Sequence, residues 1–177
     1  MEIYVIRHGQ TDWNAQKRIQ GRSDNLLNHV GKKHVEEAAA TLPEQIDIIF
    51  SSPLKRALET AEIINRRYCV DILIDERLIE RNFGVYEGNP MDSLDLDSLR
   101  RWTDNTPIVN GETIRDVAKR VFEFLDYVKS QFYGKTILIV AHGHVIRPVI
   151  WYFNGLPKKG EEVIIQTGTS EFYSFSI

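Results

Sequence analysis

The 177-residue sequence predicts a three-layer α/β/α domain built on a mostly parallel central sheet. Short runs rich in isoleucine and valine, with few charges, recur along the chain, as expected of strands covered on both faces. Amphipathic helical patterns separate these runs, and strands that alternate with helices form parallel sheets. The tail, residues 170–177, is predicted to be a last strand at an antiparallel edge.

The predicted strands cover residues 3–6, 46–50, 70–74 and 136–140. A first helix is predicted from Asn28, which can cap it, to about Leu42. A second runs from Pro53, a residue suited to a first helical turn, to about Arg67. A third covers residues 113–132, where apolar residues recur at helical spacing.

One stretch interrupts the alternation of strands and helices. Residues 88–111 are rich in Asn, Pro, Asp and Ser and hold one short helical pattern, residues 94–102. We predict that this excursion caps the functional site, in preference to serving as a plain surface connection. The whole chain, residues 1–177, is predicted to form a single domain.

Composition excludes several classes of partner. The net charge is -3, and a protein that binds nucleic acid usually carries a basic excess, so no nucleic-acid partner is expected. No apolar run approaches the roughly 20 residues that span a bilayer, and no signal peptide precedes the first strand, so we expect a cytoplasmic protein without a membrane partner. The single cysteine, Cys69, is predicted to be a buried, inert thiol. The sequence leaves the oligomeric state open.

Two similar motifs stand at the ends of two predicted strands. Arg7-His8-Gly9 follows the first strand, and Ala141-His142-Gly143 follows the fourth. Ligands of open α/β sheets bind at the carboxyl ends of strands. A lone histidine there is best explained as a hydrogen-bonded residue at the edge of the core, but the recurrence argues for a shared pocket. Two histidines beside Arg7 would make that pocket cationic and suited to a phosphate.

Arg56 lies in the first turn of the second predicted helix, whose N-terminus favours anions. A cation is unfavourable there, so Arg56 is a candidate for anion binding; the alternative is a solvated side chain paired with Glu59 or Glu62.

Glu80 follows the third predicted strand. A carboxyl group near a partly apolar wall can protonate a leaving oxygen, which phosphoryl transfer needs. The alternative is a salt bridge to Arg77 or Arg81.

Together these motifs resemble the histidine phosphatase superfamily, the group of phosphoglycerate mutases and related acid phosphatases. The resemblance runs from residue 3 to about residue 150 and includes five blocks in the same order. They are Arg7-His8-Gly9-Gln10-Thr11 with Trp13-Asn14, Ser51-Ser52-Pro53-Leu54-Lys55-Arg56-Ala57 with Thr60-Ala61, Glu80 with Phe83-Gly84-Val85-Tyr86-Glu87-Gly88, Gly111-Glu112, and Val140-Ala141-His142-Gly143.

The resemblance implies a phosphoglycerate mutase-like fold and a role for each matched residue. His8 would be the nucleophile that becomes phosphorylated, and Glu80 the proton donor. Arg7, Arg56 and His142 would hold the phosphoryl oxygens. Further substrate contacts are expected from Asn14, Gln20, Gly21 and Gly143. Because arginines and histidines neutralise the phosphate, neither a metal ion nor another cofactor is expected.

The implied activity is that of a histidine acid phosphatase-type phosphomonoesterase acting on a small phosphorylated metabolite. A phosphoglycerate mutase is the runner-up, because only residues 88–111 are available as a lid where glycolytic mutases carry a larger insertion. A catalytically silent phospho-ligand binder is a third reading, which the intact set of five site residues argues against.

His144 departs from the family pattern, where small phosphatases often have a second glycine. It is expected either to contact the leaving group or to cap the following helix. Substrate preference stays open, and the candidates for the pocket rim are Gln20, Arg22, Asn82, Trp102 and His144.

Overall fold

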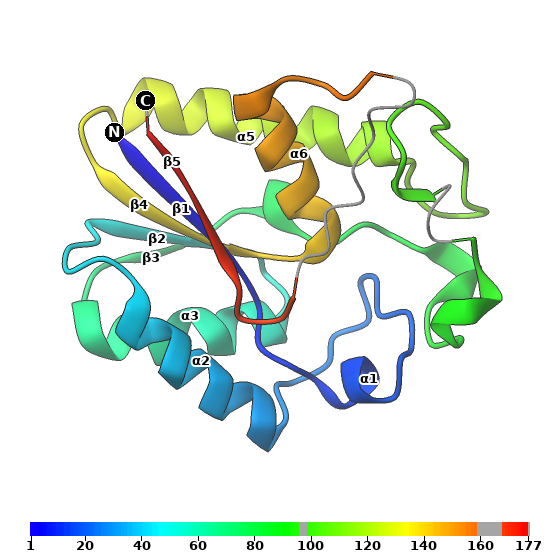
Figure 1. Ribbon diagram of the computed structural model, residues 1–177, viewed down its shortest axis with the longest axis horizontal. Coiled ribbons are helices and arrows are strands. Elements are labelled where there is room, and N and C mark those ends of the chain that lie inside the picture. The colour runs from blue at the N-terminus through cyan, green and yellow to red at the C-terminus, as the bar shows by residue number, and fades with distance from the viewer. Residues whose placement is uncertain (96–98, 159–167, 177) are drawn as a thin grey trace.

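The protein, as a computed structural model, is described for residues 1–95, 99–158 and 168–176 (Figure 1). Its five-stranded sheet has the strand order β3-β2-β4-β1-β5. The strands are β1 (Glu2–Arg7), β2 (Ile48–Ser51), β3 (Ile72–Ile74), β4 (Thr136–Ala141) and β5 (Phe172–Ser176). Neighbouring strands are parallel except β5, which pairs antiparallel with β1. The predicted fold class and its antiparallel edge are confirmed.

Helices cover both faces of the sheet (Figure 1). Helices α2 (His29–Thr41) and α3 (Lys55–Tyr68) lie on one face, and α5 (Ile114–Gln131) and α6 (Gly143–Asn154) lie on the other. The short helix α1 (Asp12–Ala15) follows β1, and three 3-10 turns, η1 (Glu76–Leu78), η2 (Gly84–Tyr86) and η3 (Met91–Ser93), follow β3. As predicted, Asn28 caps α2, where its side chain accepts from the amide of Gly31. None of the described helices combines the length and the apolar character that a membrane crossing requires.

Two hydrophobic cores follow from the alternation of side chains along the strands. Successive residues of a strand point to opposite faces of a sheet. In β1, Ile3 and Val5 therefore pack toward α5 and α6, and Ile6 packs toward α2 and α3. In β4, Ile139 packs toward α5 and α6, and Leu138 packs toward α2 and α3. The central strands are thus buried on both faces, which explains their nearly continuous apolar sequences.

The edge of the sheet departs from the sequence prediction. Strand β3 was expected to span residues 70–74 with both faces covered, but it spans Ile72–Ile74. Leu73 and Ile74 are 37% and 60% exposed, because β3 is the outermost strand and has a neighbour only at β2. Strand β2 likewise begins at Ile48, two residues after the predicted start.

Cys69 is a second correction, because it is exposed and not buried. It is the residue at which α3 ends, and its φ of 53° places it in the left-handed region. A left-handed residue of this kind commonly ends a helix. The expected burial of this thiol is therefore wrong, and its inertness stays a prediction.

The excursion over residues 88–111 packs as a small unit beside the main sheet. Leu99 and Ile108 form a third apolar cluster with Ile19 and Phe83 from outside the excursion. Of the short helix predicted over residues 94–102, residues 96–98 lie outside the described part of the chain, and Leu99 and Arg100 are helical. The capping action of this segment stays a prediction.

Candidate active site

The two strand–histidine–glycine motifs meet at one end of the sheet, as the sequence predicts. Strands β1 and β4 are parallel neighbours, and Arg7 stands beside Ala141 in their register. The next residues of the two strands, His8 and His142, therefore lie at the same level. Their ring centroids are 5.1 Å apart, and the His8 amide donates to the Ala141 carbonyl at 3.0 Å.

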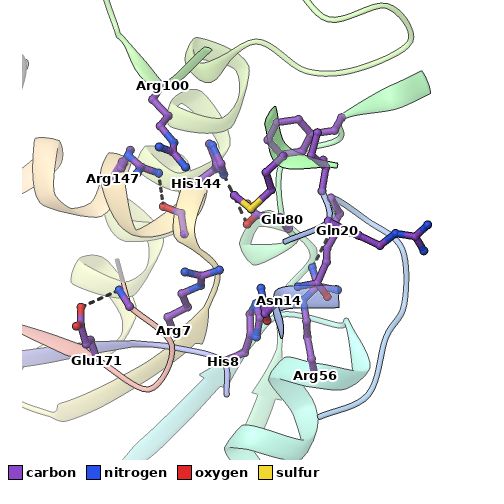
Figure 2. Close-up of a pocket in the computed structure, with 17 residues that line it drawn as sticks. Arg7, His8, Asn14, Gln20, Arg56, Glu80, Arg100, His144, Arg147 and Glu171 are labelled. Carbon is purple, nitrogen blue, oxygen red and sulfur yellow. Dashed lines mark hydrogen bonds and ion pairs between the residues drawn. The ribbon is translucent and has the colours of Figure 1, made fainter. Parts of the chain in front are cut away.

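A cavity of about 410 Å³ opens at this strand end (Figure 2). Eight of the nine predicted site residues line it, and the ninth, His142, is fully buried beside His8. The eight are Arg7, His8, Asn14, Gln20, Gly21, Arg56, Glu80 and Gly143. These residues come from β1, α1, α3, α6 and the segments that follow β1, α1 and η1, so tertiary folding alone brings them together.

The ring of His8 is held in one tautomer. Its Nδ1 lies 2.7 Å from the carbonyl oxygen of Gly9, so Nδ1 carries the proton and donates, and Nε2 keeps a lone pair. The Nε of Arg56 donates to that Nε2 at 3.2 Å. Burial, Arg56 and His142 lower the pKa of His8 well below its usual range. The ring is therefore neutral at pH 7, as a nitrogen nucleophile must be.

Arg56 is fully buried and makes none of the surface ion pairs that the sequence left open. Its Nη1 and Nη2 donate to the carbonyl oxygens of Ser23 and Gly21, both at 2.7 Å. Burial, with Arg7 nearby, lowers its pKa to about 10, so the group is still a cation at neutral pH. A guanidinium has five N–H donors, and the two left over can bind an anion.

His142 is oriented by Ser52, the residue that follows β2. Its Nε2 lies 2.7 Å from the Oγ of Ser52, while its buried Nδ1 has no hydrogen-bond partner within the described residues. A hydroxyl that donates to Nε2 leaves the proton on Nδ1, where it can be donated to a ligand. Burial and the charge of Arg56 lower the pKa of His142 well below its usual range, so it too is neutral at pH 7.

The helix N-terminus that faces the cavity is not the one the sequence indicated. The first turn of α3 is occupied by the protein itself, because the carboxylate of Asp24 accepts from the Lys55 amide at 2.8 Å and pairs with its ammonium at 3.3 Å. Helix α6 begins instead in the pocket. No side chain caps it at His142, and its first residue, Gly143, lines the cavity. This terminus is the one placed to favour an anion.

Glu80 lies across the cavity from His8 and is 7% exposed (Figure 2). Its Oε1 accepts from the Arg81 amide at 2.8 Å, and its Oε2 is 3.8 Å from the Nδ1 of His144. Burial by itself raises the pKa of Glu80, but His144, His142 and the Arg81 amide together bring that pKa well below its usual range. The alternative reading of Glu80, a salt bridge to Arg77 or Arg81, is not supported, since Arg77 pairs with Asp75 and the guanidinium of Arg81 donates to backbone carbonyls, including that of Glu112.

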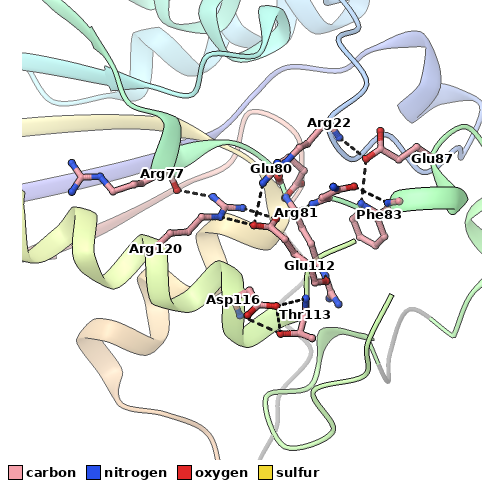
Figure 3. Close-up of polar contacts among 12 residues, drawn as sticks. Arg22, Arg77, Glu80, Arg81, Phe83, Glu87, Glu112, Thr113, Asp116 and Arg120 are labelled. Carbon is pink, nitrogen blue, oxygen red and sulfur yellow. Dashed lines mark hydrogen bonds and ion pairs between the residues drawn. The ribbon is translucent and has the colours of Figure 1, made fainter. Parts of the chain in front are cut away.

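Two half-buried carboxylates hold the segments that carry these groups (Figure 3). Glu87 accepts from the amides of Arg22, Ser23 and Phe83 at 2.9, 2.9 and 3.2 Å. It thereby ties the Gly21 loop to the segment after Glu80. Glu112 accepts from the Asn82 amide at 2.9 Å and pairs with Arg22 and Arg120. These contacts give a structural reason for the Glu87 and Gly111-Glu112 blocks.

The pocket also contains charged residues that the sequence did not single out. Arg100 and Arg147 lie on the wall away from Arg56, and Glu171 lies beyond Arg7 (Figure 2). Arg147 could have been found from its place one helical turn after Gly143, to whose carbonyl its Nη1 donates at 3.1 Å. Arg100 and Glu171 come from distant segments, and no local pattern marks them.

Of the five candidates for the pocket rim, only Gln20 and His144 line the cavity. Arg22 is engaged by Glu112, and Trp102 packs on Trp151 with ring centroids 5.7 Å apart. The side chain of Asn82 accepts from the Gly84 amide. The expectation that these three residues line the pocket is therefore wrong, because each side chain contacts a structural partner instead.

The site thus combines a neutral histidine lone pair with a wall of guanidinium groups and a carboxyl group opposite. Such groups bind oxyanions through charge-assisted hydrogen bonds, each contributing roughly 1.5–3 kcal/mol. Within the described residues, no three histidine, cysteine, aspartate or glutamate side chains form a group that could hold a metal ion. The arrangement can deliver a nucleophile to a phosphorus atom whose oxygens are held by cations.

Known proteins are similar to this chain in both sequence and fold. A Bacillus subtilis protein, named as the uncharacterized phosphatase PhoE, is 36% identical over 154 residues, which cover 86% of this chain and 77% of that protein. The Escherichia coli protein named as probable phosphoglycerate mutase GpmB is 36% identical over 168 residues, covering 91% of this chain and 78% of its own length.

Solved structures agree over nearly the whole chain. A mycobacterial glucosyl-3-phosphoglycerate phosphatase, solved with VO3, matches with a TM-score of 0.90 at 27% identity and covers 99% of this chain and 92% of that one. A phosphoserine phosphatase of Entamoeba histolytica, in complex with 3-phosphoglyceric acid, matches with a TM-score of 0.85 at 29% identity, covering 99% and 90%. The sequence model of one family matches residues 3–171. The chain belongs to the histidine phosphatase superfamily, branch 1.

Proposed function

We propose that this chain is a phosphomonoesterase that hydrolyses a small phosphorylated metabolite through a phosphohistidine on His8. The observation that carries this proposal is the state of His8, a cavity residue whose Nδ1 is tied to the Gly9 carbonyl and whose Nε2 lone pair accepts from the Arg56 guanidinium. Relatives named as phosphatases, and solved phosphatases of the same fold, support the same reaction class.

In the first step, the Arg56 Nε–H leaves the Nε2 of His8 and turns to a phosphoryl oxygen, and the freed Nε2 attacks phosphorus as the bond to the leaving oxygen breaks. We assign Arg7, Arg56 and the Nδ1 of His142 to the phosphoryl oxygens, and the α6 N-terminus at Gly143 adds a favourable dipole. Glu80 protonates the leaving oxygen. We assign Asn14, Gln20 and Gly21 to the substrate side of the pocket, where Gly21 also fixes Arg56 through its carbonyl oxygen.

In the second step, water attacks the phosphohistidine, and Glu80 accepts the proton of that water. Glu80 is ionised in the empty pocket, so it must gain a proton when substrate binds. A phosphate dianion nearby raises the pKa of a carboxyl group, because two like charges disfavour ionisation. Substrate binding therefore raises the pKa of Glu80, so that its carboxyl group holds the proton that it later donates.

Replacing His8 by alanine tests the proposal. Loss of one transition-state contact typically costs about 10²–10³-fold in rate. H8A should lose at least that much of its turnover of p-nitrophenyl phosphate. No acid-labile, alkali-stable phosphoenzyme should be trapped after acid quenching with labelled substrate. The matched control is H34A on the exposed face of α2, which should behave as wild type. Normal hydrolysis by H8A would rule the proposal out.

The product distinguishes hydrolysis from transfer. We expect 3-phosphoglycerate to yield free phosphate whether or not the 2,3-bisphosphate is present. Formation of 2-phosphoglycerate at a rate comparable with phosphate release would instead identify a mutase. Ligand binding by the wild-type enzyme without either product would indicate a silent binder.

A further inference from the structure

His144 is a buried imidazole with one nitrogen at Glu80 and the other without a partner. It lies in the first turn of α6, is 9% exposed and lines the cavity. Its Nδ1 is 3.8 Å from the Oε2 of Glu80, and its ring packs edge-on against Phe83 at 5.0 Å. Its Nε2 is buried and has no hydrogen-bond partner within the described residues. A buried polar atom without a partner costs stability and calls for a functional reason.

The alternative expectation for His144, that it caps α6, has no support in the structure. The N-cap is His142, and no side chain hydrogen-bonds the helix there. The side chain of His144 faces Glu80 and Phe83, toward the cavity and away from the first-turn amides (Figure 2). The contact through which His144 can act in the site is therefore the one with Glu80.

Charged groups surround this pair from every element that packs against it. They are Arg7 of β1, Arg56 of α3, Arg81 beside Glu80, His142 at the end of β4, and Arg147 of α6. Burial in this cationic setting lowers the pKa of His144 to about 4. In the empty pocket His144 is thus neutral and Glu80 ionised, and the Nδ1–H of the imidazole points to the carboxylate.

We propose that His144 positions Glu80 and passes protons to and from it, a role that rests on the function proposed above. When a phosphate dianion enters, the Nε2 of His144, closed to solvent in the empty pocket, becomes accessible from the cavity that the ring lines, and a hydronium proton bonds to it. At the same time the Nδ1–H bond breaks, and that proton moves to the Oε2 of Glu80. The imidazole is neutral before and after, having changed tautomer, and Glu80 has become a carboxylic acid.

The proton balance then closes over the catalytic cycle. The leaving oxygen takes the proton of Glu80 as its bond to phosphorus breaks, and the attacking water returns a proton in the second step. When phosphate leaves, that proton departs through His144 by the reverse path. The present 3.8 Å separation is long for a hydrogen bond, but such contacts often tighten only once substrate is bound.

Two substitutions distinguish proton transfer by His144 from a purely structural role of this residue in the pocket. H144A removes both nitrogens. H144N keeps an amide donor near the position of Nδ1 but cannot pass a proton through a ring. The exposed His34 on α2 supplies the matched control H34A. For each protein, kcat/KM is measured with p-nitrophenyl phosphate and with glycerol 3-phosphate, whose alkoxide leaving group requires protonation.

We expect H144A and H144N to lose about tenfold in kcat/KM on glycerol 3-phosphate, a part of the ~10²–10⁴-fold that general acid catalysis provides. Both should keep p-nitrophenyl phosphate hydrolysis near the wild-type value. Added imidazole should restore several-fold activity to H144A on the alkyl ester, and it should leave H34A unchanged. Circular dichroism and thermal unfolding verify that each variant is folded.

Three outcomes would overturn the relay. H144N with wild-type activity on the alkyl ester would show that holding Glu80 is sufficient. Equal losses on both esters would show that His144 only shapes the pocket. Failure of imidazole to rescue H144A would exclude a passing proton. Trapping the phosphoenzyme in the wild type keeps these outcomes apart from failure of the proposed function, in which no phosphohistidine would form at all.

Discussion

At the scale of single residues, the site depends on charges that the fold has removed from water. Arg56 is fully buried, yet it stays protonated because its three engaged donors meet Gly21, Ser23 and His8. Burying a charge costs free energy unless it is paired or hydrogen-bonded. The cost is accepted here because a preformed cation needs no reorganisation when charge develops on a phosphoryl oxygen.

Glu80 is the residue whose protonation state the proposed reaction must change, and E80Q tests this directly. The amide keeps the shape of the side chain but can neither give nor accept the proton. We expect kcat/KM on glycerol 3-phosphate to fall by about 10²–10⁴-fold, and p-nitrophenyl phosphate to suffer far less in the phosphorylation step. E62Q, on the exposed side of α3, is the control. Equal losses on the two esters would remove Glu80 from the role of acid.

At the scale of elements, loops and helix ends decide which groups reach the cavity. The loop after α1 turns at Gly21, whose φ of 53° suits glycine, and its carbonyl oxygen receives Arg56. The Glu87 carboxylate fixes the same loop from outside. Asp24, from the following turn, occupies the α3 terminus, so the open α6 terminus is the one left for a ligand.

Substitution G21A should uncouple Arg56 from this loop. A Cβ at residue 21 would lie 2.1 Å from the Oε1 of Glu87, and alanine is strained by roughly 1–2 kcal/mol at this φ. We expect a lower melting temperature together with a clear loss of kcat/KM. G134A supplies the comparison, because Gly134 has a φ of 78° but open space around it, so that variant should lose stability and keep activity. Equal activity in both variants would contradict the coupling.

At the scale of the whole molecule, the sheet places a cluster of neutral histidines at the carboxyl ends of its central strands. His8 and His142 end the two central strands, and His144 follows within one turn. Burial lowers the pKa of each of them. The unfolded chain therefore binds protons as the pH falls through about 6.5, while the folded chain does not, and the free energy of unfolding must decrease in that range.

Acid denaturation measures this linkage. For His144, the range runs from its unfolded value near 6.5 down to about 4, so this residue accounts for roughly 3 kcal/mol of the loss. H144N should therefore lose less free energy of unfolding than wild type between those pH values, as measured by urea titration at several pH values. Parallel curves for the two proteins would show that His144 does not titrate as described.

The sequence by itself determined the strands and helices of the sheet layers and most of the residues that meet at the cavity. Apolar runs and periodicity are local signals, and a histidine placed after a buried strand is brought to the same sheet edge in any parallel arrangement. Only the tertiary structure decided which helix terminus stays open, which carboxylates hold the loops, and that Arg100, Arg147 and Glu171 share the pocket. The exposure of Cys69 and of the edge strand β3 was decided in the same way. These features depend on contacts between residues far apart in the chain, and such contacts leave no periodic trace in the sequence around either partner.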